Sequence, residues 1–390
     1  EVTLEGVGTD FGFTLTAVGT TSSYEIFIRY VNPGSPAARQ GLNRGDVITQ
    51  IDGRTFGSGF NADADAINRA FDNQNISIAG RKSNGTSFTR SLSKGTYTSN
   101  PVFKDTVLTV NGRSIGYIAL ARFSNPSNAE SALDASFARF AAGGVTDLVV
   151  DLRYNGGGYV STDEYMGNLI APPALNGTTM FSEHFNETMQ NGEAEILKNQ
   201  PLTDENGRQR FSNGRPLTYF DVDYSVEGNT YKFAKKGPLN SVANVVFIVT
   251  GNTASASELL INSLRPHMNV QVIGERSYGK PVGFFPINID TYDVYYSMFQ
   301  SRNSAGEGDY FEGLVPDADT PDDVTHDFGD PRELSLAAAI RYLTGGSFTA
   351  SSSIKIMGRT MRANTVEFRK MGADHSFKGM IENRLKIKQR

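Results

Sequence analysis

Two apolar runs most strongly limit the fold of this 390-residue chain. VTDLVVDLR covers residues 145–153 and VVFIVT covers residues 245–250, and neither alternates regularly between apolar and polar residues. Such strands are buried on both faces, as in a parallel sheet that is covered by helices. A helical pattern precedes the first run at 128–144, and helix and strand patterns follow the second at 255–265 and 270–274. This order predicts an α/β domain with a largely parallel central sheet.

Residues 1–97 have a different pattern, with short β-prone runs between Gly, Asn and Pro and one helical pattern at 61–73. Within them, GSPAARQGLNRGDVITQIDG (34–53) resembles a PDZ domain of the bacterial protease-associated type. The resemblance implies that this β-rich unit binds a peptide C-terminus as an added strand. The terminal carboxylate would then be held by the loop residues Phe11, Gly12 and Phe13. Alternatively, the glycines only form the turns of a compact β-barrel.

The second apolar run leads directly into NTASASELL, residues 252–260. A tight turn of small residues between a strand and a helix can present a serine at the edge of a sheet, where helix N–H groups stabilise an oxyanion. The same spacing of Ser255 and Glu258 also fits a helix capping box. From this stretch alone, both a nucleophile and a cap remain open.

Two further loops favour catalysis. VIGERSYGK ends in Lys280, which can act as a general base if burial lowers its pKa and keeps it neutral; the apolar residues Val282, Phe284 and Phe285 are placed to bury it. An exposed loop lysine is the alternative. DLRYNGGG (151–158) ends in glycines that let backbone N–H groups approach a ligand, although a flexible turn would have the same sequence. A phosphate loop is disfavoured because no GK[ST] follows.

These motifs, with FEGLVPD at 311–317, resemble the C-terminal processing peptidases, which are serine endopeptidases with a Ser–Lys dyad behind a PDZ domain. The resemblance implies that Ser255 is the nucleophile and Lys280 the general base. The N–H of Ala256, with that of Gly157 or Gly158, would form the oxyanion hole. The family also implies a crotonase-like, ClpP-related peptidase core.

The chain departs from the family pattern at the third polar residue. Some branches have an acid three residues after the serine, which Glu258 supplies here as a tentative catalytic residue or as a helix cap. Other branches have Gln four residues after the lysine, where this chain has Phe284, or Asp eleven residues after the serine, where it has Pro266. A helical segment that often precedes the PDZ domain and contributes to dimerisation is missing, so the oligomeric state is open.

We therefore expect a PDZ domain at 1–97, an α/β serine peptidase domain at 98–345 and a basic extension at 346–390. Residues 165–242 are polar and rich in Gly and Asn, and are interpreted as an irregular insertion or lid. The predicted function is cleavage of proteins or peptides that the PDZ domain recruits by their apolar C-termini. Two alternatives are a non-catalytic peptide-binding scaffold and a non-peptidase Ser–Lys amidase or esterase.

The composition limits which metals, cofactors and macromolecules the chain is expected to bind. Without cysteine and with four scattered histidines, the chain has no zinc-ligand spacing, and we expect no metal or cofactor. The acidic stretch 316–330 is interpreted as a solvated loop, with a cation site as the alternative. The net charge of −5 argues against a nucleic-acid partner. Residues 349–390 nevertheless carry ten basic and three acidic side chains. This basic tail would dock on the protein itself, a membrane or a partner, or stay solvated.

The start of the chain bears on the compartment. No apolar run is long enough to span a membrane, and EVTLEGVG has neither an initiator Met nor an apolar leader. We expect a mature or trimmed chain from the periplasm or cell envelope, and membrane anchoring through a preceding segment is left open.

Overall fold

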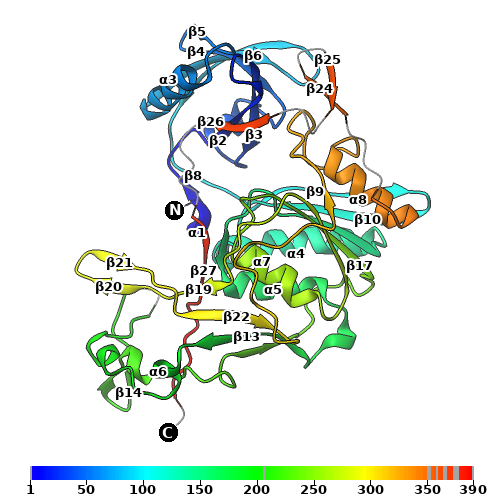
Figure 1. Ribbon diagram of the computed structural model, residues 1–390. Helices are drawn as coiled ribbons and strands as arrows, with labels where there is room; N and C mark the ends of the chain where they lie inside the picture. The colour runs from blue at the N-terminus through cyan, green and yellow to red at the C-terminus, as the bar shows by residue number, and fades with distance from the viewer. Residues whose placement is uncertain are drawn as a thin grey trace.

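The computed structural model describes residues 2–204, 207–348, 353–356, 359–362, 367–371 and 377–388. Figure 1 shows an N-terminal β-rich unit above an α/β unit, with a smaller sheet and a hairpin below. Within the described ranges, no helix is both long enough and apolar enough to cross a membrane.

The N-terminal unit is an antiparallel sheet with two helices. Its strands are β2 (Phe13–Thr20), β3 (Ser23–Val31), β4 (Val47–Ile51), β5 (Arg54–Thr55), β6 (Asn75–Arg81) and β7 (Ser87–Ser93), and its helices are α2 (Pro36–Arg39) and α3 (Phe60–Asp72). Buried apolar side chains alternate with exposed ones along the strands and form a separate core for this unit. In β6, for example, Ile76 and Ile78 are buried. Helix α3 confirms the helical pattern predicted at 61–73.

The α/β unit is built on a six-stranded sheet in the order β23-β18-β17-β11-β10-β9. The strands are β9 (Val102–Val110), β10 (Arg113–Leu120), β11 (Asp147–Asp151), β17 (Asn244–Val249), β18 (Asn269–Gly274) and β23 (Ala318–Asp319). Neighbours from β10 to β23 pair in parallel, and β9 is antiparallel to β10. The largely parallel central sheet predicted from the apolar runs is confirmed.

Helices cover both faces of this sheet, which explains why its strands lack alternation. Leu148 and Val150 pack with helices α4 (Pro126–Ala142), α5 (Val160–Ile170) and α7 (Ala256–Leu264). Val149, between them, faces α8 (Leu334–Gly345) on the other side. Every residue of β11 is buried.

A second, antiparallel sheet has the order β16-β13-β22-β19. Its strands are β13 (Thr179–Phe185), β16 (Thr230–Lys232), β19 (Val282–Gly283) and β22 (Phe299–Asn303), and the hairpin β20 (Ile287–Ile289)–β21 (Tyr292–Val294) lies beside it. The description of 165–242 as irregular therefore needs correction: it begins inside α5 and supplies β13 and β16. The prediction missed α5 because buried polar residues, including Thr162, Asp163 and Asn168, hide its apolar face.

Short elements complete the chain. These are α1 (Val2–Glu5), β1 (Val7–Gly8), β8 (Tyr97–Thr98), β12 (Gly157–Tyr159), α6 (Glu187–Gln190), β14 (Phe211–Ser212), β15 (Arg215–Pro216), β24 (Ser353–Ile356), β25 (Arg359–Arg362), β26 (Glu367–Met371) and β27 (Gly379–Ile381). Four of them belong to the basic tail. Strands β24 and β25 pair with each other, β26 extends the N-terminal sheet beside β2, and β27 pairs in parallel with β12 (Figure 1). The described part of the tail thus docks on the protein itself.

Candidate active site

The turn after β17 holds Ser255 in a strained conformation. Ser255 is buried and has φ +59° and ψ −107°, a region that side chains other than glycine rarely adopt. The turn is tied to the end of β11, since the Thr253 hydroxyl donates to the Leu152 carbonyl at 2.8 Å. Helix α7 begins at Ala256, so Ser255 stands at the helix N-cap with the Ala256 N–H in the first turn. A serine forced into this backbone geometry is a feature of nucleophile turns.

Glu258 links this turn to the loop that carries Lys280. Oε2 accepts hydrogen bonds from the backbone N–H groups of Ser255 and Lys280, each at 2.8 Å. Oε1 accepts from the Ser277 hydroxyl at 2.5 Å and from the Gly279 N–H at 2.7 Å. Burial raises the pKa of Glu258, and these hydrogen bonds oppose that rise without cancelling it. We call Glu258, Ser255, Ser277, Gly279 and Lys280 the Glu258 cluster.

The side chain of Lys280 is half-buried, and burial lowers its pKa. Its Nζ lies 4.9 Å from the centre of the Phe284 ring, so Phe284 contributes to that burial as predicted. Within the described residues, the hydrogen-bond partner of this amine is the carbonyl of Lys378 at 2.7 Å, not the Ser255 hydroxyl. The Ser255 hydroxyl itself lies 3.5 Å from the Val282 carbonyl. The candidate nucleophile and base thus share a site, and the amine of the candidate base is hydrogen-bonded to the tail.

The glycine loop lies against the serine turn. The Asn155 carbonyl accepts hydrogen bonds from the Ala254 N–H at 3.1 Å and the Ser257 hydroxyl at 3.0 Å. Gly157 and Gly158 have φ of +110° and +136°, and a Cβ on Gly157 would lie 3.1 Å from the Ala254 carbonyl. Only glycine fits there. Ser257 is an early residue of α7, as predicted.

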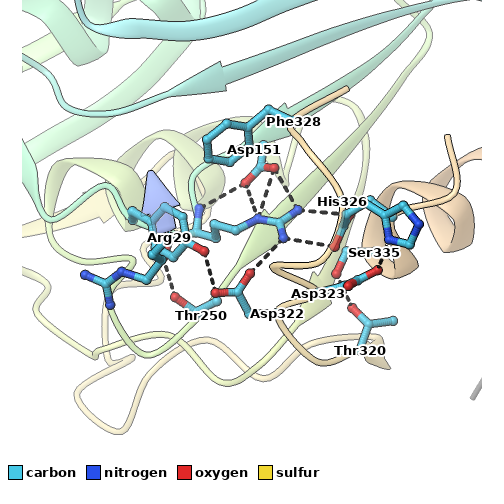
Figure 2. Close-up of polar contacts among 12 residues, drawn as sticks. Arg29, Asp151, Thr250, Thr320, Asp322, Asp323, His326, Phe328 and Ser335 are labelled. Atoms are coloured by element: carbon cyan, nitrogen blue, oxygen red, sulfur yellow. Dashed lines mark hydrogen bonds and ion pairs between the residues drawn. The ribbon is translucent and has the colours of Figure 1, made fainter. Parts of the chain in front are cut away.

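A second buried polar group lies behind the same turn and surrounds Arg153. Its guanidinium binds both oxygens of Asp151 and of Glu333 at 2.8–3.1 Å, and Asp322 at 3.0 Å. Asp322 also pairs with Arg44 of the N-terminal unit at 2.8 Å. Burial alone would lower the pKa of Arg153, but the three carboxylates raise it well above its usual value. Figure 2 shows Asp151, Asp322 and Thr250 close together; we call Arg153, Asp151, Asp322, Glu333 and Arg44 the Arg153 cluster.

The Arg153 cluster joins the site to both units of the protein. The Thr250 hydroxyl, at the start of the serine turn, donates to the Arg153 carbonyl. Arg44 reaches the cluster from the N-terminal unit and also donates to the hydroxyl of Tyr154. The acidic stretch 316–330 is therefore neither a solvated loop nor a cation site at these positions, because Asp322 pairs with two arginines and Asp323 with His326 at 2.7 Å.

Several residues that shape the site were not predicted from the sequence. Ser277 is one: its hydroxyl donates to Glu258 and accepts from the Leu314 N–H at 2.7 Å, which brings the FEGLVPD motif to the site. Arg153 and Asn155 lay inside a recognised motif and could have been singled out there. Lys378 gave no signal, since nothing in a sequence shows that residue 378 meets residue 280.

Other predicted residues lie elsewhere. Phe11 and Phe13 are buried in the core of the N-terminal unit, beside the start of β2, and are not part of the Ser255 site. Between them, the Gly12 carbonyl accepts from the Asn32 N–H at 2.7 Å.

These features describe a serine hydrolase site of α/β type joined to a PDZ unit, and comparisons with known proteins agree. The family model for peptidase family S41 matches residues 114–320, and a PDZ domain model matches residues 27–71. The chain belongs to peptidase family S41 and carries a PDZ domain.

Named relatives point the same way. The chain is 26% identical over 332 residues to the chloroplastic C-terminal processing peptidase of Tetradesmus obliquus, covering 80% of this chain and 61% of that one. It thus spans less than two thirds of that relative. It is 25% identical to the carboxyl-terminal-processing protease of a Synechocystis strain, covering 93% of this chain and 75% of the other. A solved S41 protease of Bacteroides fragilis shares the fold, with a TM-score of 0.62 and 22% identity over 87% of this chain and 83% of that one.

Proposed function

We propose that this protein is a serine endopeptidase in which Ser255 attacks the substrate and Lys280 is the general base. The observation that carries the proposal is the Glu258 cluster, in which one carboxylate holds the backbone of both residues in a single site. The lowered pKa of Lys280 supports the second role, because a lysine must be neutral to accept a proton.

In the proposed reaction, Oγ of Ser255 attacks the carbonyl carbon of a peptide bond while its proton passes to Nζ of Lys280. The oxyanion is stabilised by the N–H of Ala256 at the start of α7, with Gly157 or Gly158 as the second donor. The C–N bond then breaks, and Lys280 returns the proton to the leaving amine. Water attacks the acyl-enzyme by the same route in reverse and releases the acid. Lys280 must leave the Lys378 carbonyl before the first step.

We assign Glu258 a positioning role. Its carboxylate contacts backbone groups of the two reacting residues and the hydroxyl of Ser277, rather than the Lys280 amine. It therefore acts by fixing where Ser255 and Lys280 stand.

The predicted domain division is part of the proposal. Residues 1–97 form a peptide-recruiting PDZ domain, 98–345 the peptidase domain with 165–242 as its insertion, and 346–390 the extension. The peptidase core is expected to be of the crotonase-like, ClpP-related type. Protein substrates would add their apolar C-termini to β2 beside Phe11, Gly12 and Phe13. By analogy with the relatives, the protein would act outside the cytoplasm.

The test compares the protein with its Ser255→Ala variant. Both are incubated with an unstructured reporter protein that ends in apolar residues, and with a fluorophosphonate probe that labels activated serines. We expect cleavage and labelling in the parent only. Cleavage retained by Ser255→Ala would show that another residue is the nucleophile.

A further inference from the structure

The described end of the tail, residues 377–388, runs through the candidate active site as a peptide strand. Strand β27 pairs in parallel with β12, with Gly157 opposite Gly379 and Tyr159 opposite Ile381. On its other side, the Phe284 N–H donates to the Met380 carbonyl and the Glu382 N–H donates to the Phe284 carbonyl, each at 3.1 Å. The tail is thus a strand added between the glycine loop and the segment that follows Lys280.

This strand covers the groups that a substrate would need. Lys280 donates to the Lys378 carbonyl at 2.7 Å, so the proposed base is engaged by the tail backbone. A Cβ on Gly157 would come within 2.2 Å of the Gly379 carbonyl oxygen, which leaves no room for a second chain between them. A substrate strand and the tail cannot occupy this place together.

The tail is held in a way that protects it from cleavage. A scissile carbonyl must point its oxygen at the oxyanion donors while the base stays free to accept the serine proton. Here the Lys378 carbonyl oxygen points at the base itself. This geometry is that of an inhibitor rather than of a substrate poised for attack.

Contacts further along fix the tail to the peptidase unit. Met380 and Ile381 are buried. Arg384 pairs with Glu164 at 2.5 Å and with Glu382 at 2.9 Å. Ile387 lies opposite Val222 in an antiparallel bridge, flanked by backbone hydrogen bonds from Asp223 to Lys386 and from Lys388 to Asp221.

The same tail also pairs with an edge strand of the N-terminal unit. Strand β26 pairs in an antiparallel manner with β2, from Leu15 opposite Met371 to Gly19 opposite Glu367. An added strand on this edge is how a PDZ domain takes up a peptide. Both peptide-binding strands of the protein are therefore paired with its own C-terminal region.

We propose that residues 377–388 are a tethered inhibitory strand that fills the substrate channel and must leave β12 before a substrate can bind. The proposal rests on the proposed function of Ser255 and Lys280. It also assigns the direction of the substrate backbone, which would replace β27 and run parallel to β12.

A disulfide lock tests whether the tail has to leave. The chain has no cysteine, so Val222→Cys with Ile387→Cys introduces a single pair. The two positions face each other in an antiparallel bridge flanked by hydrogen bonds, where Cα atoms are close enough for a disulfide. We expect the oxidised protein to cleave the reporter and react with the fluorophosphonate at least ~10-fold more slowly than the reduced protein, because the competent state is depopulated.

The single variants Val222→Cys and Ile387→Cys are the controls and should not respond to reductant. Equal rates in the oxidised and reduced double variant would overturn the tail proposal and leave the proposed function intact. If Ser255 stays unlabelled in both forms and in the tail-weakened variant described next, the proposed function itself fails.

A second experiment weakens the tail without breaking the core. Arg384→Glu with Lys386→Glu reverses two charges, removes the ion pair with Glu164 and should raise the cleavage rate roughly 3- to 10-fold. Lys104→Glu with Arg208→Glu makes the same charge change at exposed positions that form no hydrogen bond or ion pair with the described residues 377–388, and should leave the rate unchanged. A synthetic peptide of residues 377–388 should inhibit the Arg384→Glu/Lys386→Glu protein. No activation together with no inhibition by the peptide would contradict the proposal.

Discussion

Two buried polar clusters lie on opposite sides of the serine turn, and they are built differently. The Glu258 cluster is one carboxylate that accepts four hydrogen bonds, three of them from backbone N–H groups. The Arg153 cluster is a set of full charges, in which a guanidinium contacts three carboxylates and Arg44 adds a second cation. The first cluster gathers residues within 25 positions of one another, from Ser255 to Lys280, whereas the second joins residues from 44 to 333.

The difference shows two ways of fixing a reactive turn. Backbone donors place the main chain of Ser255 and Lys280 directly, so a change in Glu258 should affect chemistry before stability. Paired charges deep in the protein are costly to separate, so a change in Arg153 should affect stability first.

The largest effect is expected at Lys280, the member of the Glu258 cluster that is proposed as the general base. Lys280→Met should lower kcat/KM by ~10³-fold or more, as loss of a catalytic base does. Because burial lowers the pKa of Lys280, activity of the parent should rise with pH through a midpoint below that of a free lysine. Lys232→Met, at an exposed position, is the control. A midpoint at or above the usual lysine pKa would contradict the role of burial.

Arg153→Met should have the largest effect on folding. It leaves the buried carboxylates of Asp151 and Glu333, and the partly buried one of Asp322, without this partner, so we expect a loss of about 3–5 kcal/mol in the free energy of unfolding. Arg332→Met removes an arginine from an exposed ion pair with Asp330 and should change stability far less. Denaturant melts of the two variants, compared with the parent, measure the difference. Equal losses would mean that the Arg153 cluster is worth no more than a surface pair.

The sequence predicted the regions with local signals better than the regions that join distant residues. The parallel sheet was predictable because the apolar composition of residues 145–153 and 245–250 indicates that they are buried. Ser255, Lys280 and Glu258 were predictable because each lies in a motif of a known family. The burial of Lys280 by Phe284 also followed, since the two are four residues apart.

Contacts between distant polar residues were not predictable. Arg153 and Glu333 are 180 residues apart, and an arginine in a loop looks the same whether it is buried or solvated. The pairing of β27 with β12 depends on backbone groups, which are the same at every position of a chain. Residues 165–242 hid β13 because its buried residues include the polar Ser182 and Glu183, and hid β16 because it is only three residues long.

Glu258→Gln tests the positioning role. The amide keeps the size of the side chain but offers one acceptor oxygen and an NH₂ group that faces donors. We expect kcat to fall by about 10- to 100-fold with KM little changed, together with a smaller loss of about 1 kcal/mol in stability. Glu227→Gln, an exposed change of the same kind, is the control. A change in KM alone would place Glu258 in substrate binding instead.

Asp163 shows how much stability is lost when, among the described residues, a buried carboxylate has neither backbone N–H donors nor an ion pair. Within the described residues, neither of its oxygens has a hydrogen-bond partner, and burial raises its pKa well above the usual value. The folded protein therefore holds this proton to higher pH than the unfolded chain, and stability falls as pH rises from about 4 toward the folded pKa. Asp163→Asn should flatten this dependence and stabilise the protein by about 1–2 kcal/mol at the upper end. Thermal melts at several pH values test it, with Asp65→Asn, an exposed position, as the control.

The smallest effect is expected at His326, next to the Arg153 cluster (Figure 2). Its hydrogen bond to Asp323 raises its pKa, whereas that hydrogen bond lowers the pKa of Asp323 against the effect of burial. Because the folded pKa of His326 lies above the unfolded value, its contribution is complete below pH ~6.5 and is lost as pH rises through the folded pKa. His326→Asn should remove this loss, worth at most ~1 kcal/mol, from melts between pH 6 and 8. An unchanged pH profile would show that the pair of His326 and Asp323 contributes nothing measurable to stability.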